Sequence, residues 1–156
     1  PHFIEYKAAG KIRYIGCTTS VDAQYEQMFA AMHSHKLDFI QIDYSIGNRS
    51  ANEKILPMAR DMGIAVLTNV PFGGRGRTLF PRVAGKPLPD FAKDIGASSW
   101  AQFFLKYIIG NPVVTATIPG STTVEYLRDN QAAGHGVVPD AAMRKRMEEY
   151  WDALPA

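Results

Sequence analysis

The stretch that decides the fold is residues 38–69, DFIQIDYSIGNRSANEKILPMARDMGIAVLTN. It begins with a β-branched run at residues 38–44 and ends with a second one at residues 64–69, which is nearly all apolar at its start. Between the two runs, apolar residues recur at helical spacing: Ile55, Leu56, Ala59 and Met62. A strand, a helix and a strand in this order predict two parallel strands joined by a right-handed crossover.

The same alternation continues on both sides of this stretch. Residues 12–17 predict an earlier strand and residues 113–118 a later one, and a stretch of helical periodicity follows each of the four strands. Residues 143–154 predict a final helix. Three capping boxes predict the starts of helices, at residues 50–53, 99–102 and 122–125.

Four strands that each return through a helix predict an α/β protein with a parallel sheet. The pattern fits an open doubly wound sheet and a piece of a (β/α)8 barrel equally well. A complete barrel usually needs about 200 residues or more, so 156 residues would form about half of one. In both architectures ligands bind at the carboxyl ends of the strands.

The composition is that of an ordinary globular domain, with 46% hydrophobic and 21% charged residues. No apolar run approaches the ~18 residues of a membrane span, and the first residues lack the layout of a secretory signal. The net charge of +2 is too balanced to indicate a nucleic-acid or polybasic membrane partner. Cys17 is the single cysteine, which favours a reducing, cytoplasmic setting and an inert thiol over a nucleophile.

The predicted strand ends, residues 16–20, 41–45, 69–74 and 118–122, are polar or rich in glycine. Gly120 and Ser121 precede a predicted helix, whose free N–H groups and positive dipole end favour a phosphate there. Asp43 follows Gln41 by two positions and shares its face, where it is either a polar core residue or a substrate contact. Residues 70–97 are long for a loop, which predicts a functional lid or, alternatively, simple disorder.

These strand ends carry a resemblance to a known family. Four segments occur in order and with family spacing: GKIRYIG at residues 10–16, Gln41 followed by Tyr44 and Ser45, PFGG at residues 71–74, and IPGS at residues 118–121 closed by Asn130. They resemble the carboxyl-terminal half of an aldo-keto reductase. The resemblance implies half of a TIM (β/α)8 barrel, an NADP-dependent oxidoreductase fold, in which the four strands are the fifth to eighth and the first four β/α units are missing.

The resemblance also implies a cofactor site. In the family's pattern, Thr18, Thr19 and Gln41 would contact the nicotinamide carboxamide, and Asn69 falls where an aromatic residue stacks on the ring. Thr18 can replace the family's serine, but Thr19 cannot supply the paired donor and acceptor of an asparagine. Gly73 and Gly74 would let the backbone approach the pyrophosphate, because they lack a Cβ.

The adenosine end of the cofactor would lie after the fourth strand. Gly120 and Ser121 would contact the 2'-phosphate, and Asn130 the adenine. The arginine that grips the 2'-phosphate in the family falls on Tyr126, so a cation would have to come from Arg75, Arg77 or Arg82. The implied cofactor is NADPH, with NADH as the alternative.

No catalytic residue is predicted, because the family's Tyr, Lys, Asp and His belong to the half that has no counterpart in this sequence. We therefore expect an enzyme that reduces an aldehyde or ketone, with an inactive isolated chain and with a small carbonyl substrate as the partner of the complete enzyme. The alternative is a non-catalytic half-barrel that forms a homodimer or binds a complementing half-barrel, since an unclosed parallel sheet leaves two strand edges. A third possibility, an unrelated doubly wound nucleotide binder, lacks a G-x-G-x-x-G motif after the first strand.

Overall fold

The computed structural model describes residues 2–74 and 78–155. Its four strands are β1 (Gly16–Thr18), β2 (Phe39–Asp43), β3 (Ala65–Asn69) and β4 (Val114–Thr117). The helices are α1 (His2–Ala8), α2 (Tyr25–Ser34), α3 (Ile55–Met62), α4 (Phe80–Val83), α5 (Trp100–Ile109), α6 (Val124–Ala132) and α7 (Ala141–Ala153), with 3-10 segments η1 (Asp22–Gln24), η2 (Ser50–Asn52) and η3 (Asp90–Ile95). Within these residues, no helix combines the length and the apolar character that a membrane crossing requires.

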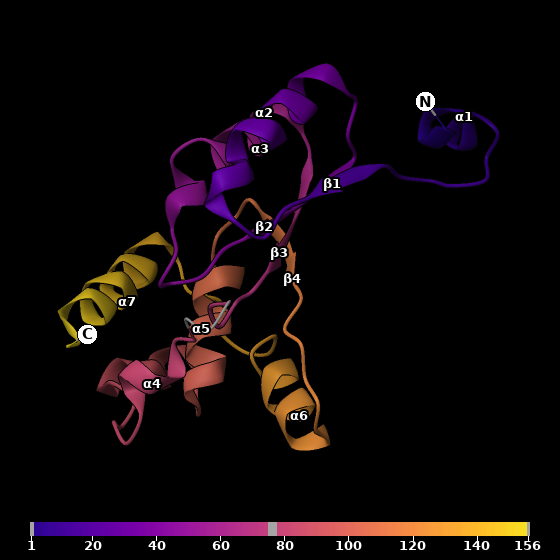
Figure 1. Ribbon diagram of the computed structural model, residues 1–156. Helices are drawn as coiled ribbons and strands as arrows, with labels where there is room; N and C mark the ends of the chain where they lie inside the picture. Colours follow the sequence, from indigo (N-terminus) through magenta and orange to yellow (C-terminus); the bar gives the residue numbers. More distant parts are fainter. Residues whose placement is uncertain (1, 75–77, 156) are drawn as a thin grey trace.

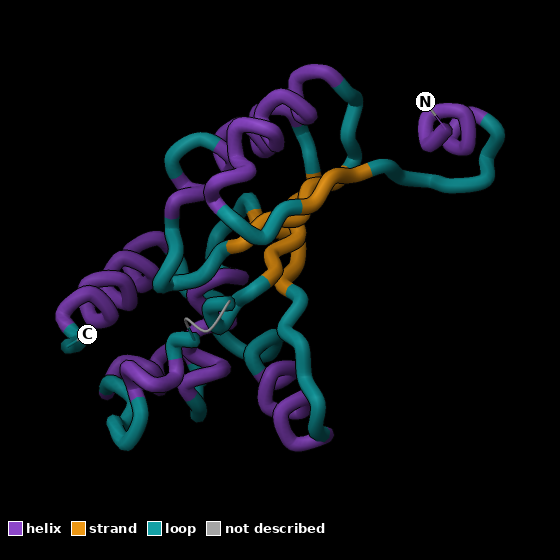
Figure 2. The backbone as a smooth tube through the Cα atoms, in the orientation of Figure 1, coloured by secondary structure: helices purple, strands orange, loops and turns teal. Residues whose placement is uncertain are grey.

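The strands form one parallel sheet in the order β1-β2-β3-β4, which confirms the predicted α/β architecture (Figure 1, Figure 2). Thr18 lies beside Gln41 in the register of β1 and β2, and Asp43 lies beside Asn69 in that of β2 and β3. Because the strands are parallel, their carboxyl ends meet at one edge of the sheet. The predicted nicotinamide residues therefore come from neighbouring strands.

Helices α2, α3 and α5 pack against β1, β3 and β4, and they bury one face of the sheet. Ile40, Ile42 and Val66 point to that face and are fully buried. The alternate residues Gln41 and Leu67 point to the other face and are only half-buried. The sheet thus has one face in the core and one face that is partly open.

The helix starts differ from the predicted capping boxes. Ser99 caps α5 as expected, because its hydroxyl accepts a hydrogen bond from Gln102 N. For α6 the cap is Thr123 rather than Thr122. The box at Ser50 is wrong, since the single hydroxyl proton of Ser50 lies between two acceptors, Asp22 Oδ2 and Asn48 Oδ1, and the hydroxyl caps no helix.

The segment after β3 is folded over most of its described length, so the alternative of simple disorder is wrong there. It contains α4 and η3, and Phe91, Ala92 and Ile95 of η3 are buried. The Phe91 ring packs against the rings of Phe103 and Tyr150. This aromatic contact joins η3 to the core between α5 and α7.

Helix α1 stands away from the sheet (Figure 1) and was not predicted. It is tied to the sheet by Lys7, whose Nζ lies 2.5 Å from Asp38 Oδ2. The same carboxylate oxygen accepts a hydrogen bond of 2.8 Å from Ile15 N. The helix buries none of its own residues, and Phe3 and Ile4 are largely exposed.

Candidate functional site

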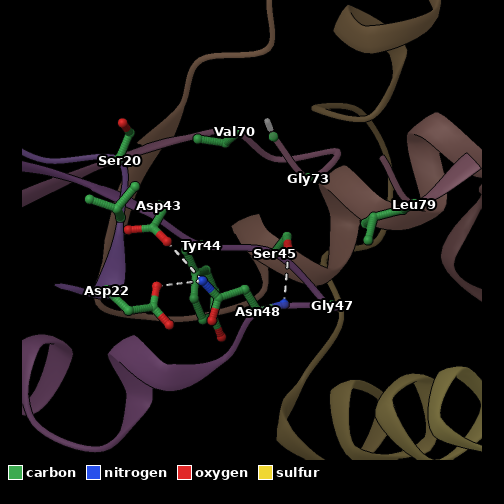
Figure 3. A pocket seen from close by; sticks show the side chains of 12 residues that line it. Ser20, Asp22, Asp43, Tyr44, Ser45, Gly47, Asn48, Val70, Gly73 and Leu79 are labelled. Atoms are coloured by element: carbon green, nitrogen blue, oxygen red, sulfur yellow. Dashed lines mark hydrogen bonds between the residues drawn. The ribbon is translucent and has the colours of Figure 1, made fainter. Parts of the chain in front are cut away.

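A cavity of about 700 Å³ lies at the carboxyl ends of β1, β2 and β3, where an α/β fold binds its ligands. Its polar side comes from the segments that follow β1 and β2, and its apolar side from the segment that follows β3 (Figure 3). The lining residues are Ser20, Val21, Asp22, Asp43, Tyr44, Ser45, Gly47, Asn48, Val70, Gly73, Gly74 and Leu79.

Two carboxylates on the polar side are held by one amide. Asn48 Nδ2 donates to Asp22 Oδ1 at 2.9 Å and to Asp43 Oδ2 at 2.7 Å, and Figure 3 shows both side chains turned toward it. The Tyr25 hydroxyl donates to Asp43 Oδ1 at 3.1 Å, and the Ser50 hydroxyl to Asp22 Oδ2 at 2.8 Å. The donors fix both carboxylates at the mouth of the cavity.

The two carboxylates differ in acidity. Burial, together with the hydrogen bond and the negative charge of Asp22, raises the pKa of Asp43 to about 6. Burial alone would raise the pKa of Asp22 as well, but hydrogen bonds from Asn48, Asp43 and Ser50 lower it below its usual value. Among the described lining residues there is no Lys or Arg. The cavity therefore suits an uncharged or cationic group better than a phosphate.

The apolar side is built on an unusual backbone. Val70 has a φ of +49°, a left-handed conformation that β-branched residues rarely adopt. Gly73 also has a positive φ, of +79°. A Cβ on Gly74 would collide with Val70 Cγ1, so the glycine at position 74 is required by packing inside the loop. This contact gives Gly74 a role other than the predicted approach to a pyrophosphate.

The predicted nicotinamide residues lie together at the ends of β1, β2 and β3. Thr18 is exposed beside the half-buried Gln41, and Asn69 Nδ2 donates to Thr19 O at 2.9 Å. Asn69 Oδ1 is buried and has no hydrogen-bond partner. The Thr19 hydroxyl, in contrast, donates to Gln24 Oε1 at 2.7 Å, which leaves Thr18 and Gln41 as the polar side chains of this group that a ligand can reach.

The predicted phosphate and adenine residues form a second group at the start of α6. Asn130 Nδ2 donates to Ser121 Oγ at 2.8 Å, which brings these two residues together across nine positions. Ser121 is exposed, and no atom lies within 4 Å of the position that a Cβ on Gly120 would take. None of these three residues lines the cavity. The predicted site residues therefore form two groups.

The predicted phosphate cations need one correction. Arg82 Nε donates to Pro155 O at 3.1 Å, its Nη2 donates to Leu154 O, and its guanidinium lies over the Trp151 ring. These contacts hold Arg82 against the end of α7, so the prediction that it grips a phosphate is wrong. Arg75 and Arg77 lie outside the described residues.

Sequence reasoning missed Asp22, Asn48 and Tyr25 as parts of the site. They come from the segments after β1 and β2, and no short motif connects Asp22 with Asn48, which lie 26 positions apart. For Asp43, the structure favours a position at the cavity over a purely internal one. No group of three or more His, Cys, Asp or Glu side chains in residues 2–74 and 78–155 could hold a metal ion.

Comparison with known proteins gives consistent matches. A family model described as "Aldo/keto reductase family" matches residues 1–152. The uncharacterised oxidoreductase YrpG of Bacillus subtilis is 31% identical over 145 residues, which cover 78% of this chain and 44% of that protein. Pyridoxine 4-dehydrogenase of Escherichia coli is 28% identical over 129 residues, covering 83% of this chain and 42% of the relative.

Among solved structures, an aldo/keto reductase from Klebsiella pneumoniae in complex with NADP and acetate superposes with a TM-score of 0.73 at 22% identity. The match covers 95% of this chain and 51% of that one. At this identity the likeness establishes the fold alone, which is that of part of a TIM barrel. The chain spans about half the length of the relatives it matches.

Proposed function

This chain belongs to the aldo/keto reductase family, a family of oxidoreductases, and from that membership we propose that it is the carboxyl-terminal, cofactor-holding half of an NADP(H)-dependent carbonyl reductase. The complete enzyme would reduce an aldehyde or ketone to an alcohol. The Klebsiella pneumoniae relative, which carries NADP, supports a dinucleotide as the ligand. The free thiol of Cys17 supports the cytoplasm as its compartment.

The observation that carries the proposal is the hydrogen bond between Asn130 and Ser121 at the start of α6. It places two candidate nucleotide contacts side by side, next to the open backbone of Gly120 and the positive end of a nine-residue helix. In this proposal Ser121 and the backbone of Gly120 bind the phosphate end of the cofactor. Asn130 orients Ser121 and contacts the adenine.

The nicotinamide end would lie over the ends of β1, β2 and β3. A carboxamide has one acceptor and two donor positions. The exposed hydroxyl of Thr18 and the half-buried amide of Gln41, which lie side by side in neighbouring strands, would meet them. The acidic cavity favours this uncharged or cationic end over the phosphates. When bound, the cofactor would supply the hydride, while the residues named here bind and orient it.

The proton donor of carbonyl reduction would come from outside this chain. In this proposal the family's catalytic Tyr, Lys, Asp and His lie in the part of the relatives that this chain does not cover, since it spans 44% of YrpG and 51% of the Klebsiella pneumoniae structure. We therefore expect the isolated chain to bind the cofactor without turning over a carbonyl substrate.

Calorimetric titration tests this proposal directly. The chain is titrated with NADPH and, separately, with NADH, and a saturable heat at micromolar to millimolar cofactor is the expected result for at least one of them. A chain that gives no saturable signal with either cofactor up to millimolar concentration does not have this function.

A second candidate function, a half-barrel that acts by association, is favoured by the accessible surface of 9262 Å². A compact monomer of 17.2 kDa should expose about 7,800 Å². Large apolar side chains are exposed at both edges of the sheet: Phe3, Ile4, Tyr6 and Tyr14 near β1, and Ile118, Val124, Tyr126 and Leu127 near β4. The excess of about 1,500 Å² is nearly twice the area that one side of a standard interface buries, which is about 800 Å².

Light scattering on the eluted protein distinguishes the two candidates. A half-barrel that pairs with a second copy should elute at twice the 17.2 kDa of the monomer, and Leu127→Glu should shift it back. Met62→Glu is the matched control, because Met62 is about as exposed as Leu127 but lies on α3, away from both edges. A monomer at all micromolar concentrations rules out self-association.

A further inference from the structure

A buried chain of hydrogen bonds connects the cavity to α7, although α7 contributes none of the described lining residues. Tyr44 lines the cavity through the segment after β2, and its side chain is fully buried. Its hydroxyl lies 2.7 Å from Arg144 Nη2, 3.2 Å from Asn111 Nδ2 and 3.2 Å from the Tyr107 hydroxyl. Tyr107 is also fully buried, and its hydroxyl lies 2.5 Å from Glu148 Oε1.

The chemistry of the groups fixes the direction of these bonds. Arg144 and Asn111 Nδ2 can only donate, so they occupy the two lone pairs of the Tyr44 hydroxyl. Tyr44 therefore donates its proton to the Tyr107 oxygen, and Tyr107 donates to the Glu148 carboxylate. Burial, the interaction with Tyr44 and the bond to Glu148 raise the pKa of Tyr107, so its proton stays in place. The donors and acceptors of this hydrogen-bond network are all paired in a single arrangement of the protons.

Helix α7 supplies Arg144 and Glu148, the two outer members of this hydrogen-bond network. They lie on one face of the helix because they are four residues apart. It also binds the far end of the same segment. Arg49 Nη2 donates to Asp152 Oδ1 at 2.8 Å and Oδ2 at 3.0 Å, and Arg49 Nη1 lies 3.9 Å from Glu148 Oε2. The wall formed by residues 44–48 is therefore fixed to α7 at both of its ends.

The opposite wall is attached to α7 as well. Leu79 lines the cavity just before α4, and Arg82 of α4 contacts the Trp151 ring of α7 and the backbone oxygens of Leu154 and Pro155, which directly follow α7. A Cβ on Gly47 would lie 2.6 Å from Leu79 Cδ2 and 3.6 Å from Trp151 Cζ2. The two walls thus meet over Trp151, which is buried.

We propose that α7 is a positioning element, which sets the shape of the cavity by fixing residues 44–48 and the Leu79–α4 segment to each other. Arg144 is the principal positioning residue of α7, because it donates to the Tyr44 hydroxyl and so anchors the wall formed by residues 44–48. None of the described lining residues belongs to α7, so the helix acts on the ligand only through the two walls. The part of the proposal that concerns ligand affinity rests on the proposed function.

Hydrogen–deuterium exchange tests the proposal without a ligand. The Ser45 and Asn48 amides donate within the first wall, so their exchange reports its order. Arg144→Met keeps an unbranched side chain, like the aliphatic part of arginine, and removes the guanidinium. It should speed exchange of these amides at least tenfold and leave the amides of β2 and β3 unchanged. In calorimetry the same variant should weaken NADPH binding at least fivefold.

Arg146→Met is the matched control, since Arg146 lies on the same helix and stacks on Phe91 without contacting either wall. It should change neither measurement. Asp152→Asn replaces Arg144→Met if the latter does not fold, because the Asp152 side chain is 54% exposed and its carboxylate pairs with Arg49 alone among the described residues. It should speed exchange at Asn48 several-fold, and unchanged exchange overturns the proposal.

The two proposals fail separately. Unchanged exchange at Ser45 and Asn48 in a folded Arg144→Met protein overturns the role of α7, and so does unchanged NADPH affinity where the unaltered protein binds NADPH. If the unaltered protein binds no NADPH, the proposed function fails, and the exchange experiment alone decides the role of α7.

Discussion

Val70 and Gly74 occupy adjoining space in the loop after β3, so that a Cβ on Gly74 would collide with Val70 Cγ1. Val70 is already in a left-handed conformation, with a φ of +49°, and cannot easily move away. Gly74→Ala should therefore destabilise the protein by about 1–3 kcal/mol, as overpacking does. Thermal or urea unfolding measures the loss.

Gly120→Ala is the control for this prediction. No atom lies within 4 Å of the position of its Cβ, and its φ is not positive. It should change the free energy of unfolding by less than about 0.5 kcal/mol. Equal effects of the two substitutions would show that the Val70 contact does not limit position 74.

The raised pKa of Asp43 predicts a pH dependence of stability. The native state favours the protonated form of this acid, because its pKa is about 6 in the folded protein and 3.8 for an unperturbed aspartate side chain. Its contribution to stability is complete below pH 3.8 and is lost as the pH rises through 6. Asp43→Asn cannot ionise, so at about pH 7.5 it should be more stable than the unaltered protein, by at most about 3 kcal/mol.

Thermal unfolding between about pH 4 and pH 7.5 measures this difference. Asp43→Asn keeps one side-chain acceptor, for Asn48 Nδ2, and the Tyr25 hydroxyl can still donate to the backbone O of residue 43, which lies 3.2 Å away. The gap between the two proteins should close toward the acidic end of the range. Parallel pH profiles would mean that Asp43 is ionised throughout this range.

A third prediction concerns the start of α6. Ser121→Ala removes the hydroxyl that accepts from Asn130, and it should weaken NADPH binding by about tenfold to a hundredfold, the effect of about one hydrogen bond to a charged group. NADH has no 2'-phosphate and should lose less than about twofold. Calorimetry with both cofactors gives the two ratios. An equal loss for both would place Ser121 away from the 2'-phosphate.

Lys106 carries the fourth prediction. It is fully buried in α5, and its Nζ donates to His135 O at 2.7 Å and Val137 O at 3.0 Å. Burial lowers its pKa. Lys106→Met would leave both carbonyls without these donors, so it should cost about 2 kcal/mol in urea unfolding. Lys145→Met, at a 77% exposed side chain, should cost less than about 0.5 kcal/mol; a similar cost at both positions would contradict the prediction.

The parallel sheet was predictable because its signals are local. The apolar runs around Ile42 and Val66 and the helix between them are each visible within a few residues. The ends of the strands were less predictable. Strand β1 begins at Gly16 and not at residue 12, because its start is set by backbone pairing with β2. Ser50 was misread for the same reason. Its hydroxyl is used by Asp22, a partner 28 positions away that no local pattern includes.

The proximity of candidate site residues was predictable only where one short segment holds both of them. Ser121 and Asn130 lie nine positions apart across one turn and one helix, and the structure brings them together. The cavity depends instead on contacts between distant segments, such as Asn48 with Asp22 and Arg144 with Tyr44. Arg82 shows the converse, because a side chain expected to grip a phosphate is bound by the end of α7.

The order of the strands in the sheet has a consequence for how the molecule folds. Each strand pairs with the one before it in the chain, so the sheet can grow by one β/α unit at a time, without waiting for distant sequence. The bond between Arg144 and Tyr44 spans 100 positions and can form only after the last helix has been made. We therefore expect the sheet to form from local contacts, and residues 44–48 to reach their final arrangement only once α7 has packed against them.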